Sequence, residues 1–270
     1  MINLSCVPVT SLFDINRKSV DGRDIRQYKI WLKKTIDLFP NVLVFHDGCL
    51  EEKEFPNANL LRLKKNELAI FKYVSEVEQL IKKGYGNRGD ITFKIAEYSL
   101  IQYSKFELLA RAVENSGAHS ALWVDAGVSR FFHDFSKMSN LEENSIRLIE
   151  SNIDMVVEVD VRNNISIFPP GIFRSVPGTC HRVFSGTSFW VNGKSCRKLV
   201  DLIDKEAEKW LTDDMWDNEQ IMMRNALPTS GLKILYLPQR KETGTVARDF
   251  NSAPSRKHQF LSTLIEKNLL

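Results

Sequence analysis

The sequence predicts a single α/β domain in which helices flank a central, mostly parallel mixed sheet. Apolar, strand-like runs alternate with amphipathic, helix-like stretches through the first half of the chain, the order that produces a parallel sheet covered by helices. No linker divides the 270 residues. We therefore expect one domain over residues 1–240 and a basic C-terminal segment over 241–270.

Hydrophobic periodicity places the individual elements along the chain. The expected strands are residues 7–13, 42–45, 60–63, 121–124, 155–161, 165–168, 182–190 and 233–237. The expected helices are residues 24–39, 66–83, 104–115, 193–211 and 213–225. The helix start at residue 104 depends on Ser104 and Glu107, which fit a capping box. A turn at 162–164 is expected to join two strands, and residues 185–187 to break another.

Composition and charge place the chain among ordinary globular proteins. Hydrophobic residues make up 43% of the chain and charged residues 26%. The 37 basic and 34 acidic residues leave a formal net charge of +3, which gives no general case for a nucleic-acid partner. A local cationic site for a phosphorylated substrate remains compatible with this balance, because a few Arg and Lys side chains suffice for it.

The N-terminal region and the cysteines indicate a reducing compartment. Residues 1–17 carry no basic n-region, so we expect the first strand there and not a signal peptide. No apolar run reaches membrane-spanning length. The cysteines form no C-x-x-C pair, which argues against a zinc site and against a disulfide-stapled secreted fold. The prediction is a cytoplasmic protein. The cysteines are Cys6, Cys49, Cys180 and Cys196.

Acidic residues follow three of the expected strands. They are Asp14, Asp47 and Asp125. Polar groups just past the carboxyl ends of strands converge on one cleft in open α/β sheets. A simple turn is the better interpretation of Asp47, because Gly48 follows it. Asp125 has the stronger functional interpretation, because the small residues after it leave the backbone open to a ligand.

Several segments together resemble a known protein family. They are TSLFDINR at residues 10–17, YKIW at 28–31, NVLVF at 41–45, SKF at 104–106 and LWVDAG at 122–127. In this order they resemble the bacterial HtrL/YibB-like family, which is itself similar to glycosyltransferases of the GT-A fold. The resemblance covers most of residues 1–190 and implies a GT-A-like, Rossmann-like domain that binds a nucleotide-diphosphosugar donor at the strand ends.

The resemblance also implies a divalent cation, Mn²⁺ or Mg²⁺, at Asp125. The acidic motif of GT-A enzymes usually has two carboxylates one residue apart, one for the ribose or sugar and one for the metal. Gly127 stands at the second position here, so Asp125 matches the first carboxylate only. A lone carboxylate can hold a metal together with substrate phosphates and waters. A metal-independent site, in which Lys and Arg balance the diphosphate, is the alternative.

Further donor-binding residues are expected around these strand ends. Asp14 and Arg17 follow the first strand, and Ala126 and Gly127 continue the acidic loop. Lys105 is expected to open a helix, where free backbone amides favour a phosphate. An ordinary surface lysine is the alternative for Lys105. Arg130 follows the same loop and suits a bidentate contact with a phosphate.

The acceptor side is expected in the second half of the chain. Residues 185–190 resemble the small and aromatic stretch that lines the acceptor in GT-A enzymes, which makes Gly186, Thr187 and Trp190 substrate-binding candidates. A core position is the alternative for Trp190. Glu219 is the expected catalytic base, with Asp217 as the second choice.

Two other groups of charged residues in this half are not assigned to the site: an acidic pair and a basic C-terminal tail. Helix-dipole effects explain Asp213 and Asp214. The basic tail either folds over the donor to neutralise the leaving diphosphate or is a solvated extension. Its cationic residues are Arg240, Lys241, Arg248, Arg256, Lys257 and His258.

The residues and the resemblance together predict a hexosyltransferase-like glycosyltransferase. It is expected to move a sugar from a nucleotide donor to a saccharide or glycolipid acceptor in lipopolysaccharide or surface polysaccharide assembly, with peripheral contact at the inner membrane face. A non-catalytic nucleotide- or saccharide-binding protein is one alternative, favoured by the missing second carboxylate. A sugar nucleotidyltransferase is the other, although no Gly-rich basic loop near the first strand favours it.

Overall fold

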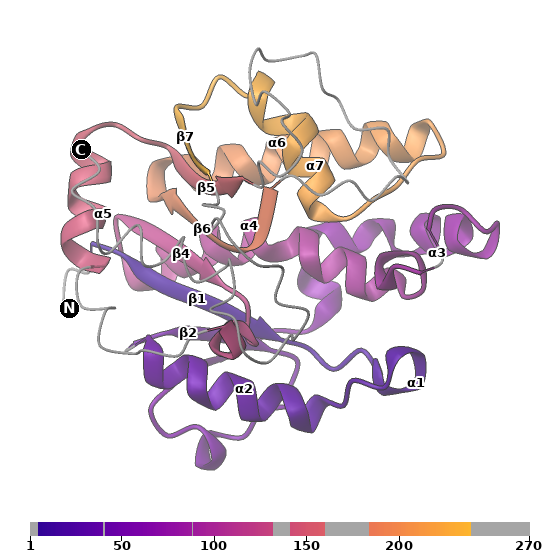
Figure 1. The fold of residues 1–270 in the computed structure, drawn as a ribbon, viewed down its shortest axis with the longest axis horizontal. Helices are drawn as coiled ribbons and strands as arrows, with labels where there is room; N and C mark the ends of the chain where they lie inside the picture. Colours follow the sequence, from indigo (N-terminus) through magenta and orange to yellow (C-terminus); the bar gives the residue numbers. More distant parts are fainter. Residues whose placement is uncertain (1–4, 40, 88, 132–140, 160–183, 239–270) are drawn as a thin grey trace, which may run out of the picture.

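The computed structural model describes residues 5–39, 41–87, 89–131, 141–159 and 184–238. In these residues the chain forms a seven-stranded sheet with helices on both faces (Figure 1). This confirms the predicted α/β class with a central, mostly parallel mixed sheet. The strands are β1 (Val7–Leu12), β2 (Leu43–His46), β3 (Asn59–Arg62), β4 (Ser120–Val124), β5 (Met155–Val159), β6 (Phe184–Asn192) and β7 (Ile234–Pro238).

The strand order is β3-β2-β1-β4-β6-β5-β7. β1 is parallel to β2 and β4, β2 is parallel to β3, and β5 is parallel to β7. β6 runs antiparallel to both of its neighbours, β4 and β5. As a result the middle of β6 lies beside the carboxyl end of β4, where Val124 pairs with Ser188, and the first residues of β6 run past this end.

The helices connect these strands over both faces of the sheet. The α-helices are α1 (Lys18–Asp21), α2 (Ile25–Leu38), α3 (Val74–Lys82), α4 (Ala96–Ser116), α5 (Leu141–Glu150), α6 (Gly193–Thr212) and α7 (Glu219–Ala226). The short 3-10 helices are η1 (Glu52–Glu54), η2 (Lys65–Glu67), η3 (Ala69–Tyr73), η4 (Ile91–Phe93), η5 (Val128–Phe131) and η6 (Leu227–Thr229). No helix in these described ranges is both long and apolar enough to cross a membrane.

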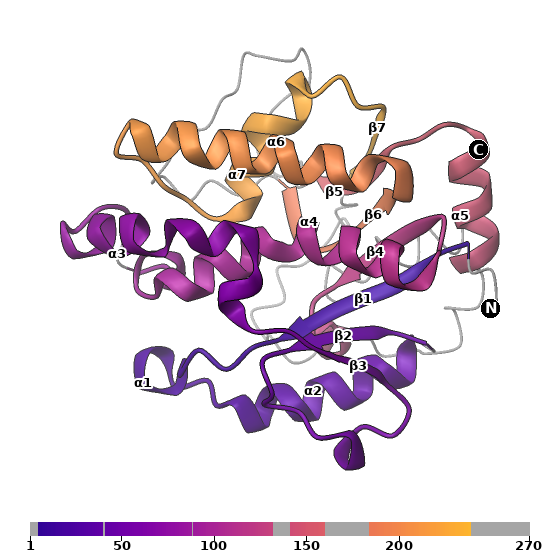
Figure 2. The same ribbon diagram turned by 180° about the vertical axis from the view of Figure 1, so that it is seen from behind.

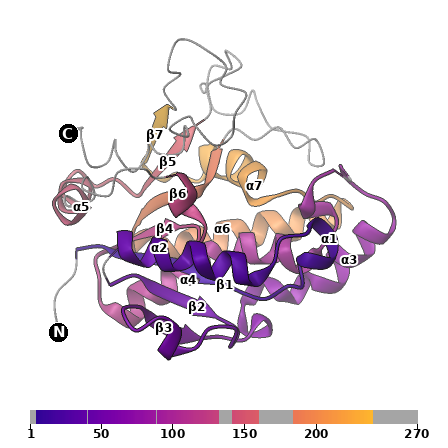
Figure 3. The ribbon, with the colours of Figure 1, turned by 60° about the horizontal axis from the view of Figure 1, so that its bottom comes forward.

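Two hydrophobic cores form because successive residues of a strand point to opposite faces of the sheet. On β4, Ala121 and Trp123 belong to the core under α3, α4, α6 and α7. Leu122 and Val124 belong to the core under α2 and α5. Figure 2 shows α4 and α6 side by side over the first face, and Figure 3 shows α2 and, apart from it, α5. Because both faces are covered, β4 is buried along its whole length.

The predicted helix start at residue 104 is wrong, because α4 begins at Ala96. Ser104 therefore lies inside the helix, where its Oγ donates to the Ile101 carbonyl at 2.8 Å instead of capping a first turn. The Glu107 carboxylate accepts from Arg111 and from the Ala69 amide. A Ser-x-x-Glu pattern marks a helix start only where the preceding residues leave the helix, and residues 96–103 continue it. Lys105 consequently has no free helix-terminal amides beside it.

Three other expectations on secondary structure need correction. The helix expected at 66–83 is divided into η2, η3 and the shorter α3. The helix expected at 213–225 begins only at Glu219, because Asp214 takes a left-handed backbone with φ 53° and Asn218 caps the next helix. β6 continues without a break through residues 185–187.

Several expectations fall on residues that the structure does not describe. The turn at 162–164, the strand at 165–168, Cys180 and the basic tail lie outside the described residues. Within the described part, Cys6, Cys49 and Cys196 are free thiols.

Gly193, the first residue of α6, sets how closely this helix approaches the start of β4. Its amide donates to the His119 carbonyl at 2.8 Å, and a Cβ at this position would lie 2.8 Å from the same oxygen. We expect Gly193→Ala to lower the free energy of unfolding by about 1–3 kcal/mol, because the added methyl pushes α6 off the sheet. Urea denaturation measures this loss.

Gly89→Ala is the matched control for this experiment. A Cβ at Gly89 would lie 3.1 Å from the Asn87 side-chain oxygen, which can move away. Its free energy of unfolding should stay within about 0.5 kcal/mol of the wild type. Equal losses in the two variants would contradict the steric explanation.

Candidate functional site

The carboxyl ends of β1, β2 and β4 meet at one edge of the sheet, as parallel strands require. Just past β1, the Asp14 amide donates to Asp47 Oδ2 at 3.0 Å. Lys65 reaches the same place, where its Nζ donates to the Asp14 carbonyl at 3.2 Å and to Glu97 at 2.7 Å. Asp47 also accepts from the Cys49 amide. It therefore forms the predicted turn and ties the end of β2 to the end of β1.

The loop after β4 is held from two sides. The Asp125 amide donates to the Thr187 carbonyl of β6 at 2.9 Å, and the Val128 amide donates back to the Asp125 carbonyl at 2.8 Å. Thr35 of α2 donates its hydroxyl to the Ala126 carbonyl at 2.9 Å. These bonds fix the backbone of the acidic loop between β6 and α2, so the place of its carboxylate is set by the fold.

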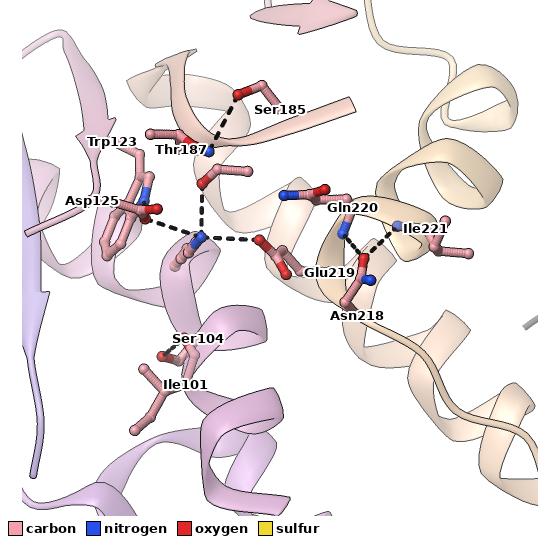
Figure 4. Close-up of polar contacts among 12 residues, drawn as sticks. Ile101, Ser104, Trp123, Asp125, Ser185, Thr187, Asn218, Glu219, Gln220 and Ile221 are labelled. Atoms are coloured by element: carbon pink, nitrogen blue, oxygen red, sulfur yellow. Dashed lines mark hydrogen bonds and ion pairs between the residues drawn. The ribbon is translucent and has the colours of Figure 1, made fainter. Parts of the chain in front are cut away.

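A buried ammonium group lies behind this loop. Lys105, within α4, is only 1% exposed. Its Nζ donates to the Gly186 carbonyl at 2.7 Å and to Glu219 Oε1 at 3.0 Å, and lies 3.2 Å from Asp125 Oδ1. Figure 4 shows the side chains of Asp125 and Glu219 directed toward each other from the β4 loop and from α7. We call Lys105, Asp125, Gly186 and Glu219 the Lys105 cluster; it joins α4, the β4 loop, β6 and α7.

Lys105 stays charged despite its burial. Removal from water by itself lowers the pKa of a lysine, but attraction to Asp125 and Glu219 outweighs burial and raises the pKa of Lys105 above its ordinary value. The ammonium also lies 5.5 Å from the centre of the Trp123 ring, within range of a cation–π interaction. Trp123 Nε1 in turn donates to Asp125 Oδ1 at 2.9 Å.

The two carboxylates of the cluster differ in their access to solvent. The Asp125 side chain is 36% exposed, whereas that of Glu219 is 4% exposed. Asp125 is therefore the member that can contact a ligand directly. Lys105 and Glu219 are buried, and Lys105 pairs with both carboxylates. A buried ion pair contributes little net stability compared with apolar residues of similar size. Perturbed ionisable groups of this kind cluster at functional sites.

Gly186 gives Glu219 access to the ammonium. A Cβ at Gly186 would overlap Glu219 Oε1 and lie 3.0 Å from the Glu219 carboxyl carbon. Next to it, the Gln220 amide, oriented to satisfy both of its atoms, donates to the Phe184 carbonyl at 3.3 Å and accepts from the Gly186 amide at 3.2 Å. The start of α7 therefore docks against the start of β6 through a residue that has no side chain.

Arg17 lies at the same edge, in a contact with two tyrosines. Its Nε donates to Asp21 at 2.7 Å, and its guanidinium lies 4.7 Å from the Tyr98 ring and 6.0 Å from the Tyr28 ring. Burial raises the pKa of Tyr98, and this side chain interacts electrostatically with Glu219, Arg17 and Lys105. Tyr98 thus links the predicted residue Arg17 with the Lys105 cluster.

Sequence reasoning missed Tyr98, and it included Trp123 in the segment around Asp125 without giving this side chain a role. Tyr98 is at position i−7 from Lys105, which puts both on one face of α4. Trp123 precedes Asp125 by two residues on β4, so the two side chains are on one face of that strand. The signal at Tyr98 could be used only once α4 was known to begin at Ala96, because the expected helix began at residue 104.

Not all of the predicted residues join the cluster. Trp190 is fully buried, and its Nε1 donates to Ser145 on the face covered by α2 and α5, which is the core position left open by the sequence. Asp217 is also fully buried, and its carbonyl accepts from the Tyr103 hydroxyl at 2.8 Å. Thr187 is 3% exposed and acts through its backbone on the β4 loop. Arg130 lies in η5, and its side chain is outside the described set.

The side chains around Asp125 do not fit a divalent cation. Asp125 Oδ1 already accepts from Trp123 and contacts the Lys105 ammonium, and Gly127 offers no second carboxylate. The nearby carboxylate of Glu219 is engaged by the same ammonium. Among the residues described, no three His, Cys, Asp or Glu side chains converge in a way that would hold a metal ion. The metal role predicted for Asp125 therefore has no support in this donor set.

Comparisons with known proteins find only weak likenesses to solved structures. No protein-family model and no curated protein matches the sequence. CMP:2-keto-3-deoxy-manno-octonic acid synthetase complexed with CTP is 11% identical, with a TM-score of 0.38 over 87% of this chain and 89% of the other. A 4-diphosphocytidyl-2C-methyl-D-erythritol synthase from Anaerococcus prevotii DSM 20548 is 10% identical, with a TM-score of 0.36 over 97% and 98% of the chains.

The bifunctional IspDF from Campylobacter jejuni is 11% identical, with a TM-score of 0.35 over 90% of this chain and 52% of the other. TM-scores and identities at this level carry no argument about the activity of this chain.

The approach of Glu219 to Lys105 depends on Gly186, which can be tested by substitution. In Gly186→Ala the new methyl overlaps the Glu219 carboxylate, so the start of α7 must move or Glu219 must leave the ammonium. We expect the free energy of unfolding to fall by about 3–5 kcal/mol, the range for breaking one partner of a buried ion pair. Urea denaturation measures the loss.

A double-mutant cycle with Glu219→Ala separates this clash from general damage to β6. Removing the carboxylate also removes the atom that the Gly186→Ala methyl meets, so the double variant should lose much less than the sum of the single losses. The coupling should fall in the range of about 0.5–3 kcal/mol seen for contacting residues. Additive losses would show that Glu219 does not lie against Gly186.

Proposed function

We propose that this protein is a glycosyltransferase that moves a sugar from a nucleotide-diphosphosugar to a saccharide acceptor. The observation that carries the proposal is the Lys105 cluster at the carboxyl edge of the sheet, in which Asp125 alone has substantial solvent exposure. Ligands of open α/β sheets bind at this edge. The same proposal places the chain with the HtrL/YibB-like family that its sequence resembles.

In this proposal Asp125 and Arg17 bind the donor. Asp125 accepts hydrogen bonds from hydroxyl groups of the donor ribose or sugar, and Trp123 and Lys105 hold its carboxylate in place. Arg17 has a side chain that is 12% exposed and stacks on Tyr98, so its position is set before a ligand arrives. A guanidinium in this place suits the diphosphate, because it binds phosphate oxygens in a bidentate way.

The transfer itself requires one bond exchange and one proton transfer. The bond between the anomeric carbon and the diphosphate oxygen breaks, and the acceptor hydroxyl oxygen forms the new bond to that carbon. The hydroxyl proton passes to a carboxylate, and the nucleoside diphosphate leaves with the bonding electron pair. Cationic groups at the leaving diphosphate lower the barrier, because negative charge grows there in the transition state.

The assignment of the proton acceptor to Glu219 stays a prediction. Its carboxylate is 4% exposed and accepts from Lys105, so an acceptor hydroxyl can reach it only if the residues packed around it move. Asp125 is the more exposed carboxylate of the pair. The proposed acceptor is a saccharide or glycolipid of surface polysaccharide assembly, a substrate class that depends on the family resemblance alone.

A product assay distinguishes this proposal from its two alternatives. Thermal-shift screening of nucleotide sugars first selects a donor, because a ligand that binds only the folded state raises the unfolding temperature. Release of the nucleoside diphosphate with transfer to an oligosaccharide supports the glycosyltransferase. Release of pyrophosphate from a nucleoside triphosphate and a sugar phosphate supports the nucleotidyltransferase. Donor binding without any product supports the binding protein.

Asp125→Asn is expected to abolish most of the transfer with little loss of stability. The amide keeps an oxygen that accepts from Trp123 Nε1, but it removes the charge that faces the donor. Loss of one preorganised electrostatic group costs on the order of 10²–10³ in kcat. Steady-state kinetics with the selected donor measure the change.

Glu114→Gln is the matched control for Asp125→Asn. Glu114 lies on α4 like Lys105, but its side chain is 50% exposed and pairs with Arg197 at the surface. Its loss should leave kcat near the wild-type value. Wild-type turnover by Asp125→Asn would show that the reaction does not need Asp125 and would contradict the proposed site.

Glu219→Gln separates catalysis from binding at the second carboxylate. If Glu219 accepts the hydroxyl proton, its loss lowers kcat by on the order of 10²–10⁴ with little change in donor affinity, because a base acts mainly in the transition state. The glutamine keeps an oxygen that can accept from Lys105. Calorimetry gives donor affinity, and turnover is measured on the same preparation.

Asp213→Asn serves as the control for this variant, since Asp213 is an exposed carboxylate directly after α6. It should change neither quantity. Weakened donor binding at unchanged saturating turnover in Glu219→Gln would assign Glu219 to the donor instead.

A further inference from the structure

We propose that the Lys105 ammonium is the built-in cation of this site and takes the place beside Asp125 that a divalent metal ion would occupy. The role of this cation in turnover rests on the proposed function. Its place in the structure does not, because it follows from the contacts of Lys105 with Asp125, Gly186 and Glu219.

The oxygen atoms around Lys105 are a set that a hard cation prefers. Asp125 and Glu219 supply carboxylate oxygens from separate elements, and Gly186 supplies a backbone carbonyl. Magnesium and calcium ions in proteins are bound by the same kinds of oxygen. Here the three oxygens lie between 2.7 and 3.2 Å from a nitrogen atom.

Three oxygens surround the ammonium, which carries three N–H groups and no acceptor. It donates to the Gly186 carbonyl and to Glu219, and it forms an ion pair with Asp125 at 3.2 Å. Lys105 is 1% exposed, and its position within α4 keeps the ammonium against β6 and α7. On the side of Asp125 that faces Lys105, a metal ion can therefore take the place between Asp125 Oδ1, Glu219 and the Gly186 carbonyl only if Lys105 is displaced.

Lys105 acts as a positioning residue in this scheme. Its side chain is 2% exposed, so it meets no substrate atom itself. It holds one oxygen of Asp125, and its positive charge offsets the negative charge that a diphosphate brings to this edge. The missing second carboxylate at Gly127 then has an explanation, because a site with its own cation needs no further metal ligand.

Metal binding by the wild-type protein tests the inference without any substrate. Chelator-treated protein is titrated with Mn²⁺ and with Mg²⁺ by calorimetry, and Mn²⁺ binding is followed in parallel by electron paramagnetic resonance. Asp125→Asn is the reference. We expect the wild type and Asp125→Asn to give the same Mn²⁺ and Mg²⁺ titration curves. Saturable Mn²⁺ binding by the wild type that Asp125→Asn abolishes would overturn the inference.

Removal of the ammonium should turn the same oxygens into a metal site. Lys105→Ala leaves an open space between Asp125, Glu219 and the Gly186 carbonyl, whereas Lys105→Met fills that space without a charge. We expect Mn²⁺ to raise the unfolding temperature of Lys105→Ala but not that of Lys105→Met or of the wild type. The further change Glu219→Gln in Lys105→Ala should cancel the effect.

The opposite results in the variants would overturn the inference. An equal rise in Lys105→Met and Lys105→Ala, or no rise in a folded Lys105→Ala, means that these oxygens are not a cation site. If Lys105→Ala does not fold, the wild-type titration still decides between the two outcomes.

Turnover provides the second readout and separates this inference from the proposed function. With an active donor and acceptor, chelator should leave the kcat of the wild type unchanged, and Mn²⁺ should restore part of the lost turnover to Lys105→Ala only. Loss of wild-type turnover in chelator, regained with Mn²⁺, would contradict the inference while leaving the glycosyltransferase intact. Absence of turnover with every donor would contradict the proposed function, and metal binding would still test the role of Lys105.

Discussion

The burial of one ammonium group constrains the whole candidate site. A lysine nitrogen removed from water requires an acceptor for each of its donors, and Lys105 finds them on the loop after β4, on β6 and on α7. The loop after β4, strand β6 and helix α7 are far apart in the sequence, and all three must therefore contact the nitrogen of this one side chain of α4. The antiparallel direction of β6 makes this meeting feasible, because it carries the first residues of β6 past the carboxyl end of β4.

The energetics of this arrangement favour a functional explanation over a structural one. Apolar side chains of similar volume would fill the space under the sheet edge at least as stably as a buried ionic cluster. The cluster provides what apolar packing cannot, because it holds the Asp125 carboxylate in place while this side chain stays 36% exposed. The Arg17 guanidinium, which lies 4.7 Å from the Tyr98 ring, is a second positioned cation at this edge of the sheet.

Among the described residues, the sequence predicted the strands better than it predicted the helices. The short apolar run before Asp125 was identified correctly, because a fully buried strand leaves an uninterrupted apolar pattern. α4 was misjudged because it is buried on several sides, which removes the amphipathic contrast that marks a helix. Its Ser104-to-Glu107 pattern then suggested a false start. Trp190 illustrates the same limit, since an aromatic residue in a strand has no local signal that tells a core position from a binding one.

Local pattern by itself determined the fold class, because periodicity and turn residues act over a few neighbouring positions. Strand-end chemistry led to the prediction that Asp125 lies at the site. The sequence also pointed to Lys105 and Glu219, but as separate members of a donor side and an acceptor side. Only the tertiary structure joined them through one ion-pair network. That contact depends on the direction of β6, on the full length of α4 and on the absence of a side chain at Gly186. These are relations between distant segments, which no local pattern in the chain encodes.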